Sequence, residues 1–160
     1  MSETEHAEHL TQQAHDRLKE ELQRRSTTLR QEITDRIEVA RGHGDLKENA
    51  EYHAAKDEQG MNEDRIRVLE SRLRNAVISE VDPNSGEVAV GMIVTVDDDG
   101  DVEEYFIGSM EDTPGEGVEV VSASSPMGKA LLGSKRGDAV SYTGPTGVTF
   151  TMTITDVRAP

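Results

Sequence analysis

The stretch that decides the fold of this chain is GHGDLKENAEYHAA, residues 42–55. A segment with helical apolar spacing runs into this stretch, and a second such segment runs out of it. Gly42 and Gly44 lie between the two segments, and glycine commonly terminates a helix. The stretch therefore predicts the turn of an antiparallel helical hairpin, with the carboxylates of Asp45 and Glu48 at its tip.

Both flanking segments carry a narrow apolar seam, with the spacings of three, four or seven that are typical of a coiled coil. The first helix is expected to follow an N-cap at Thr11, and the second to begin between Asp45 and Ala50. The seam residues are Leu18, Leu22, Leu29, Ile33, Ile37 and Ala40, and then Ala55, Ile66, Leu69, Leu73 and Ala76. Arg25 interrupts the first seam and predicts weaker packing there. Because so narrow a seam does not stabilise an isolated helix, the two helices must pair.

The second half of the chain changes to a period of two, which is typical of β-strands. The segment Asp82–Gly86 predicts a turn at the domain boundary, and a Pro-started short helix is expected over Ser125–Gly133. Strands are expected over 88–96, 102–107, 118–121, 138–142 and 148–157. The predicted fold class is α+β, a coiled-coil hairpin followed by a small antiparallel β-sheet module with one short helix. The predicted domains are a flexible tail (1–10), the hairpin (11–80) and the β-rich module (81–160).

The composition excludes several kinds of function. The chain has no Cys, which rules out disulfides and thiolate metal sites. Its net charge of −15 argues against free binding to duplex nucleic acid, because Lys and Arg on phosphates supply most of that affinity. Any nucleic-acid contact should be local, or made inside a larger complex. No apolar run approaches membrane-spanning length and the start is acidic, so we expect a soluble cytoplasmic protein without a membrane partner.

The segment Gly44–Lys56 resembles the signature of the bacterial Gre-type transcript cleavage factors. A second match lies at Ser125–Gly133, and the order of a hairpin followed by a β-rich module is also that of the family. The resemblance covers nearly the whole chain from about Leu10. It implies a transcription elongation factor whose second module has the immunophilin (FKBP-like) fold.

The resemblance also implies a mechanism. Such a protein is not itself an enzyme: it binds RNA polymerase, inserts its hairpin into the secondary channel and stimulates the polymerase's own cleavage of a backtracked RNA 3′ end. The matching tip residues, Asp45 and Glu48, would help hold a second Mg²⁺ in the polymerase site. Two carboxylates alone make a poor Mg²⁺ site, so the free protein should bind the ion weakly. The implied RNA-contacting residues are Arg41 and Lys56, and the implied polymerase-docking residues are Ser125, Pro126, Met127 and Leu131. A hairpin closed on itself needs no partner chain, so we expect a monomer.

Alternatives remain for the tip residues. The segment from Asp45 to Glu48 also has the form of a capping box, in which both side chains would bond to N–H groups at the start of the helix. His43 and His53 flank the tip, but their spacing fits no standard metal motif and favours solvated side chains. Tyr52 could stack on a base or pack across the helix pair, and the sequence leaves both open.

Alternatives also remain for the function. The protein could be a Gre homologue that occupies the channel as a regulator or inhibitor without promoting cleavage. It could also be a coiled-coil adaptor for an unrelated partner. Prolyl isomerase activity is not expected of the FKBP-like module, because fold does not carry function and aromatic residues that could line a proline pocket are scarce.

Overall fold

The computed structural model describes residues 7–80, 82 and 84–160. The chain divides into two compact units, one formed by Asp16–Asn75 and the other by Met1–His15 with Ala76–Pro160. The first unit is helical and the second contains the strands. None of the described helices is long and apolar enough to cross a membrane.

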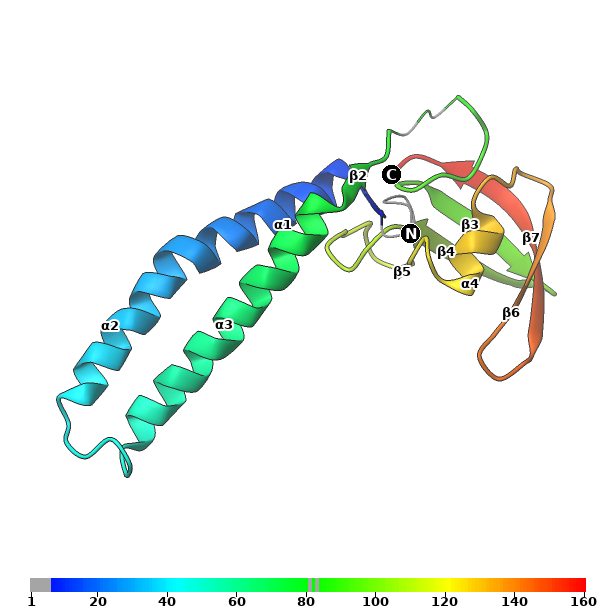
Figure 1. Cartoon of the computed structure of the whole chain (residues 1–160). Coiled ribbons are helices and arrows are strands. Elements are labelled where there is room, and N and C mark those ends of the chain that lie inside the picture. Colours follow the sequence, from blue (N-terminus) through cyan, green and yellow to red (C-terminus); the bar gives the residue numbers. More distant parts are fainter. Residues whose placement is uncertain (1–6, 81, 83) are drawn as a thin grey trace. The chain divides into compact units, whose positions relative to one another are not determined.

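The helical unit is an antiparallel hairpin (Figure 1). Its first arm is a continuous helical run made of α1 (Gln12–Arg24), the π-helical segment η2 (Arg25–Leu29) and α2 (Arg30–Arg41). Its second arm is α3 (Ala50–Arg74). The N–H of Ala14 donates to Oγ1 of Thr11 at 3.0 Å, so Thr11 is the N-cap of α1. The predicted hairpin and its first N-cap are confirmed.

All the predicted seam residues are at least half-buried. The buried seam residues are Leu18, Ile33, Ile37, Ala40, Ala55, Ile66 and Leu69. Leu22, Leu29 and Leu73 are half-buried. Bidentate ion pairs also cross between the arms: Arg30 with Glu63, Arg36 with Glu58 and Arg65 with Glu21. Apolar burial therefore holds the arms together, and exposed ion pairs add at most a small increment.

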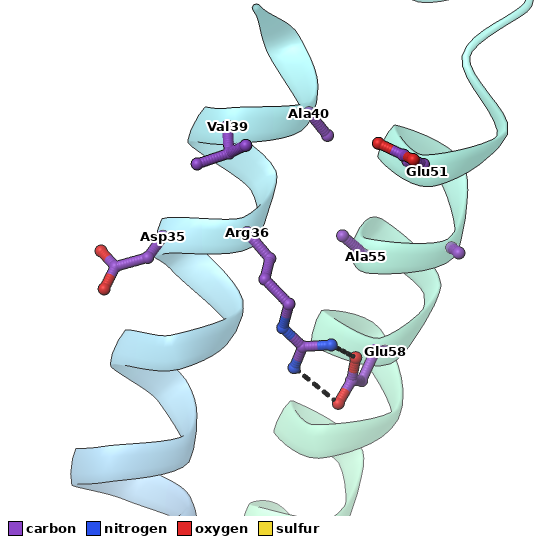
Figure 2. Close-up of a pocket in the computed structure, with 8 residues that line it drawn as sticks. Asp35, Arg36, Val39, Ala40, Glu51, Ala55 and Glu58 are labelled. Carbon is purple, nitrogen blue, oxygen red and sulfur yellow. Dashed lines mark hydrogen bonds and ion pairs between the residues drawn. The ribbon is translucent and has the colours of Figure 1, made fainter. Parts of the chain in front are cut away.

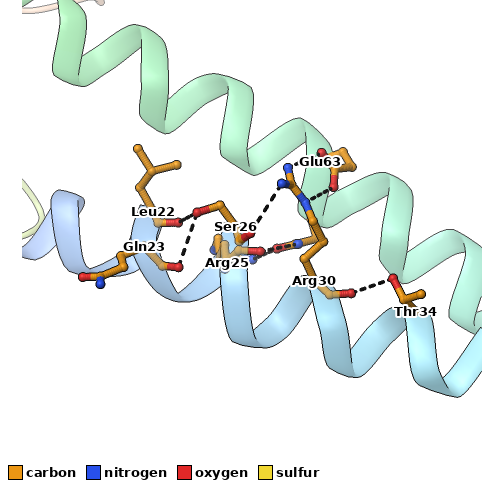
Figure 3. Close-up of polar contacts among 8 residues, drawn as sticks. Leu22, Gln23, Arg25, Ser26, Arg30, Thr34 and Glu63 are labelled. Atoms are coloured by element: carbon orange, nitrogen blue, oxygen red, sulfur yellow. Dashed lines mark hydrogen bonds and ion pairs between the residues drawn. The ribbon is translucent and has the colours of Figure 1, made fainter.

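The interruption predicted at Arg25 coincides with η2 (Figure 3). Oγ of Ser26 donates to the carbonyl oxygen of Leu22 at 2.7 Å, and Oγ1 of Thr27 donates to that of Gln23 at 2.6 Å. Hydroxyl groups that bond to carbonyls one turn back compete with the backbone ladder and bend helices. The local sequence therefore favours the wider π turn at this point.

A buried amide on the second arm completes this interruption. Asn62 is only 3% exposed, and its Nδ2 donates to the carbonyl oxygen of Arg25 at 3.0 Å. In return, Nη1 of Arg25 donates to Oδ1 of Asn62 at 3.1 Å. Directional polar contacts in an otherwise apolar seam fix the register of two helices, because any slip leaves buried polar groups unpaired. The sequence predicts only the weak apolar packing at Arg25. The structure shows that the hydrogen bonds between Arg25 and Asn62 take its place.

Glu21 sits between two guanidinium groups beside this contact. It accepts hydrogen bonds from Arg65 at 2.9 Å and from Nε of Arg25 at 2.7 Å. The bond from Arg65, supported by Arg25, holds the pKa of Glu21 at about 2, well below its ordinary value of 4.5, although partial burial acts to raise it.

This depressed pKa predicts an acid-sensitive hairpin. A carboxylate whose pKa is lower in the folded state contributes stability above its unfolded pKa, and that stability is lost as the pH falls. We expect the helical melting temperature, followed by far-UV circular dichroism, to drop between pH 4.5 and about 2. Glu21→Gln should show a smaller drop in melting temperature across this window. Some of the drop should remain, because the pKa values of Glu58 and Glu63 are also lowered by their arginine partners. Glu20→Gln, at an exposed neighbouring position, is the control; equal slopes for both variants would contradict the role of Glu21.

The second unit contains a five-stranded sheet in the order β5–β4–β3–β7–β6. Its strands are β3 (Ile93–Asp98), β4 (Asp101–Ile107), β5 (Val118–Val121), β6 (Ala139–Thr143) and β7 (Thr149–Arg158). The predicted α+β class with one short helix, α4 (Pro126–Leu131), is confirmed. The sheet is mixed rather than antiparallel, because β5 pairs in parallel with β4. The long segment 108–117 separates these strands and returns the chain before β5, whereas an antiparallel neighbour would need only a tight turn.

The segment Asp97–Asp101 forms the tight turn of a β-hairpin between β3 and β4. Asp99 and Gly100 have φ angles of 50° and 97°, the two positive values that a type I′ turn requires. The strand predicted over 88–96 begins only at Ile93. Gly91, with φ of 95°, breaks the extended run before it, although Val88 and Val90 are still buried.

The core of this unit lies among the sheet strands, α4 and the segment before β3. Its buried members are Val88, Val90, Val94, Val96, Tyr105, Ile107, Leu131, Val140, Met152 and Ile154. The alternation expected of half-buried strands places these side chains inward. The polar side chains that alternate with them along the strands lie mostly on the other, more exposed side of the sheet.

A second sheet, of two strands, shows that part of the predicted flexible tail is ordered. Strand β1 (Glu8–Leu10) pairs in parallel with β2 (Ala76–Ile78), and Leu10 is fully buried. Thr11, next in the chain, donates from its hydroxyl to the buried carboxylate of Asp112. The tail prediction is therefore wrong for residues 8–10, because strand pairing and burial of Leu10 order them; residues 1–6 lie outside the described part. The compact units of the structure divide at 15/16 and 75/76, a few residues from the predicted divisions at 10/11 and 80/81.

Candidate functional site at the hairpin tip

The loop that joins α2 to α3 carries both candidate carboxylates. Asp45 and Glu48 are exposed in this loop, which lies at the end of the hairpin opposite the start of α1 (Figure 1). Oδ1 of Asp45 accepts from the N–H of Lys47 at 3.0 Å, and the N–H of Glu48 donates to the carbonyl oxygen of Asp45 at 3.3 Å. The carboxylate of Glu48 makes no hydrogen bond or ion pair with any described residue. An acid at this position is therefore available to an external ligand.

The capping-box interpretation of these two residues is wrong. The N-cap of α3 is Asn49, whose Oδ1 accepts from the N–H of Tyr52 at 3.0 Å. Asp45 lies too early in the chain to cap this helix and instead closes a local Asx turn on Lys47. The tip carboxylates are thus not consumed in satisfying the helix N-terminus.

Asn49 is the functional-site residue that sequence reasoning missed. Besides capping α3, it donates from Nδ2 to the carbonyl oxygen of Ala40, in the last turn of α2, at 2.6 Å. Asn directly before a helical segment is a recognisable N-cap signal, so the cap could have been found from the sequence. The bond to Ala40 could not, because it depends on where the other arm lies.

A shallow hollow of about 390 Å³ lies at the tip, lined by His43, Asp45, Glu48, Asn49, Ala50 and Glu51. Its histidine, His43, lies 3.8 Å from Glu51, and the ring of His53 lies 3.4 Å from the carbonyl oxygen of Lys47. Within the described ranges, no three His, Cys, Asp or Glu side chains come together in a way that could hold a metal ion. The two carboxylates offer oxygen ligands of the kind that Mg²⁺ prefers, but only part of its shell.

The basic residues near the tip remain accessible. Arg41 is exposed, and its guanidinium carbon lies 5.9 Å from the ring centroid of Tyr52. Lys56 is also exposed and donates from Nζ to Gln59 at 2.9 Å. Tyr52 is half-buried against the apolar cluster that includes Ile33, which favours the packing interpretation over base stacking. RNA contact by Arg41 and Lys56 stays a prediction.

Alanines and longer polar side chains line a groove in the hairpin below the tip (Figure 2). The groove, of about 450 Å³, lies between α2 and α3, where Ala40, Ala54 and Ala55 replace the larger seam residues. The ion pair of Arg36 with Glu58 spans the two arms at its lower end. The seam between the arms is therefore only thinly filled by apolar side chains at this point.

The residues predicted to dock on the polymerase lie at α4, in the strand-containing unit. Ser125 is the N-cap of α4, with Oγ accepting from the N–H of Gly128 at 3.0 Å, and Pro126 is exposed in the first turn. Met127 is half-buried against the core. Leu131 is fully buried, so its assignment to a docking surface is corrected: it lies on the inward face of the helix. Ser125 and Pro126 remain the accessible candidates.

Comparison with known proteins identifies the class to which this fold and acidic tip belong. Residues 8–78 match the family model "Transcription elongation factor, N-terminal", and residues 82–159 match "Transcription elongation factor, GreA/GreB, C-term". The two units are thus those of a transcription elongation factor. The chain belongs to the GreA/GreB family and is of the GreA type.

Individual relatives are similar in sequence to this protein over most of its length. It is 44% identical to the transcription elongation factor GreA of Macrococcus caseolyticus, over 92% of this chain and 94% of the relative. The identity to GreA of Oceanobacillus iheyensis is 47%, over 87% and 89%. Among solved structures, that of GreA factor homolog 1 (Gfh1) of Thermus thermophilus is 30% identical, covers 96% of this chain and 99% of its own, and has a TM-score of 0.42.

Proposed function

We propose that this GreA-type factor acts in the cytoplasm on RNA polymerase, with its hairpin inserted into the secondary channel. There it stimulates the polymerase's own cleavage of backtracked RNA 3′ ends and so rescues arrested elongation complexes. The observation that supports this most is the exposed carboxylate pair at the tip, in which Glu48 has no bonding partner among the described residues. An acid left free at the end of a helical hairpin suits a protein that lends ligands to another enzyme's site.

The metal in this proposal is a second Mg²⁺ in the polymerase site. When bound, such an ion stabilises the attacking and leaving oxygens of the phosphodiester that is cleaved. Asp45 and Glu48 would each supply carboxylate oxygen to it. Because two carboxylates fill only part of an octahedral shell, the other ligands must come from the polymerase, the RNA and water, and the free protein should bind Mg²⁺ weakly.

The remaining candidate residues have supporting roles. Arg41 and Lys56 are exposed cations on either side of the tip loop, suited to the phosphates of the extruded RNA 3′ end. Ser125 and Pro126 at the start of α4 are the accessible part of the proposed polymerase-docking surface. The protein acts as a monomer, since the hairpin buries its own seam.

A reconstituted backtracked complex tests this function. RNA labelled at its 3′ end is followed with and without the protein, together with recovery of elongation when nucleotides are added. Faster release of 3′ fragments, followed by resumed elongation, is expected. Polymerase binding that slows elongation without releasing fragments would favour the alternative of a channel regulator or inhibitor. Failure to bind the polymerase at all would refute the proposal.

A further inference from the structure

We propose that Asn49 is a positioning residue for the tip carboxylates, an inference that rests on the proposed function. Its side-chain amide uses both of its ends. Nδ2 donates to the carbonyl oxygen of Ala40 at 2.6 Å, while Oδ1 accepts from the N–H of Tyr52 at 3.0 Å. One planar group thus joins the last turn of α2 to the first turn of α3.

This bridge closes the segment 41–48 into a loop that is anchored at both ends. Within the loop, Oδ1 of Asp45 accepts a hydrogen bond from the N–H of Lys47 at 3.0 Å. The carbonyl oxygen of Asp45 accepts a second one from the N–H of Glu48 at 3.3 Å. These local bonds hold the two carboxylate-bearing residues relative to each other. The Asn49 bridge then holds the loop relative to the helix ends.

The loop needs such an anchor because its sequence is permissive. Gly42 and Gly44 lie between α2 and Asp45, and Gly44 has φ of 122°, in the left-handed region. Glycine gives the chain more conformational freedom than any other residue, so an unanchored loop would sample many tip geometries. A ligand that is lent to another enzyme's metal acts best when it is already oriented.

The bridge can be separated from the cap by substitution. Ser is as good an N-cap as Asn, so Asn49→Ser retains an acceptor for the N–H of Tyr52. It lacks the separate amide donor that bonds to Ala40 at the same time. Asn49→Ala removes both functions. Asn84→Ser, at an exposed turn position in the other unit, makes the same chemical change away from the tip.

The first measurement uses the free full-length protein. Backbone order parameters from NMR relaxation are expected to fall over residues 45–48 in Asn49→Ser, from about 0.8 to below about 0.6, with helical circular dichroism unchanged. Asn84→Ser should match the original protein. Unchanged order parameters in Asn49→Ser would overturn the inference, whatever the protein does to RNA polymerase.

The second measurement is stimulated cleavage in the backtracked complex, over a series of factor concentrations. Asn49→Ser should lower the rate at saturation about tenfold. A fixed misplacement of a reacting group by about 1 Å costs on the order of 100-fold, but a loosened loop still samples the productive geometry part of the time. The half-saturating concentration should stay the same, since docking does not involve the loop. A variant rate equal to that of the original protein would refute the positioning role. If the original protein itself stimulates no cleavage, the proposed function fails and the order parameters still decide whether Asn49 anchors the loop.

Discussion

Glu48→Gln is expected to lower stimulated RNA cleavage by about 100-fold or more, while binding to the polymerase is unchanged. The substitution preserves the size of the side chain but replaces a charged oxygen ligand with a neutral amide, which is a poor ligand for Mg²⁺. Since Glu48 is exposed and has no bonding partner among the described residues, its replacement should not alter stability. Loss of activity would therefore report on the chemistry of the tip.

The measurement is single-turnover release of labelled 3′ fragments from a backtracked complex, with polymerase affinity determined separately by competition. Asp45→Asn should behave in the same way, and a higher Mg²⁺ concentration should partly restore its rate. Asp57→Asn is the matched control, because it removes the same charge from an exposed position on α3 outside the tip loop. Normal cleavage by Glu48→Gln would show that the tip carboxylates do not have the role proposed for them.

Gly128→Ala is expected to destabilise the strand-containing unit by about 3 kcal/mol or more, since overpacking against backbone cannot relax easily. A Cβ atom at Gly128 would lie 2.0 Å from the carbonyl oxygen of Ser122 and 2.9 Å from its carbonyl carbon. That carbonyl cannot simply move away, because it accepts hydrogen bonds from both the N–H and the hydroxyl of Ser125, the N-cap of α4. The methyl group would therefore displace α4 and disturb its cap.

Thermal unfolding followed by circular dichroism measures this effect, and a loss of this size should lower the melting temperature by about 10 °C or more. Gly60→Ala is the matched control. It makes the same change in the middle of α3, where an added Cβ would meet no atom within 4 Å. It should stabilise the hairpin by about 0.5–1 kcal/mol, because Ala is the better helix former. A melting temperature for Gly128→Ala equal to that of the unsubstituted chain would contradict the close packing of α4.

The parts of the fold that could be predicted are those governed by short-range periodicity. The seam from Leu18 to Ala40 and the turn around Asp99 follow from spacing and from the φ angles that particular residues tolerate. The exposure of Asp45 and Glu48 followed for the same reason, since a loop between two amphipathic helices must lie at the end of their pair. These features need no knowledge of distant neighbours.

The errors occur where a residue's environment is supplied by a distant part of the chain. Leu131 matched a docking motif but is buried, because α4 turns that face toward the sheet. Leu10 lies in a polar, acidic stretch, yet it is ordered by pairing of β1 with β2, far along the sequence. The parallel addition of β5 to β4 likewise depends on the path of the segment between them.

The helical hairpin, its acidic tip and the α+β character of the second unit follow from local sequence, because periodicity and turn preference act over a few residues. The bond from Asn49 to Ala40 and the bond from Asn62 to the interrupted helix at Arg25 become apparent only in the folded chain. Each of these bonds joins groups on opposite arms of the hairpin. A side-chain amide acquires such a partner only when packing brings the second arm within hydrogen-bonding distance.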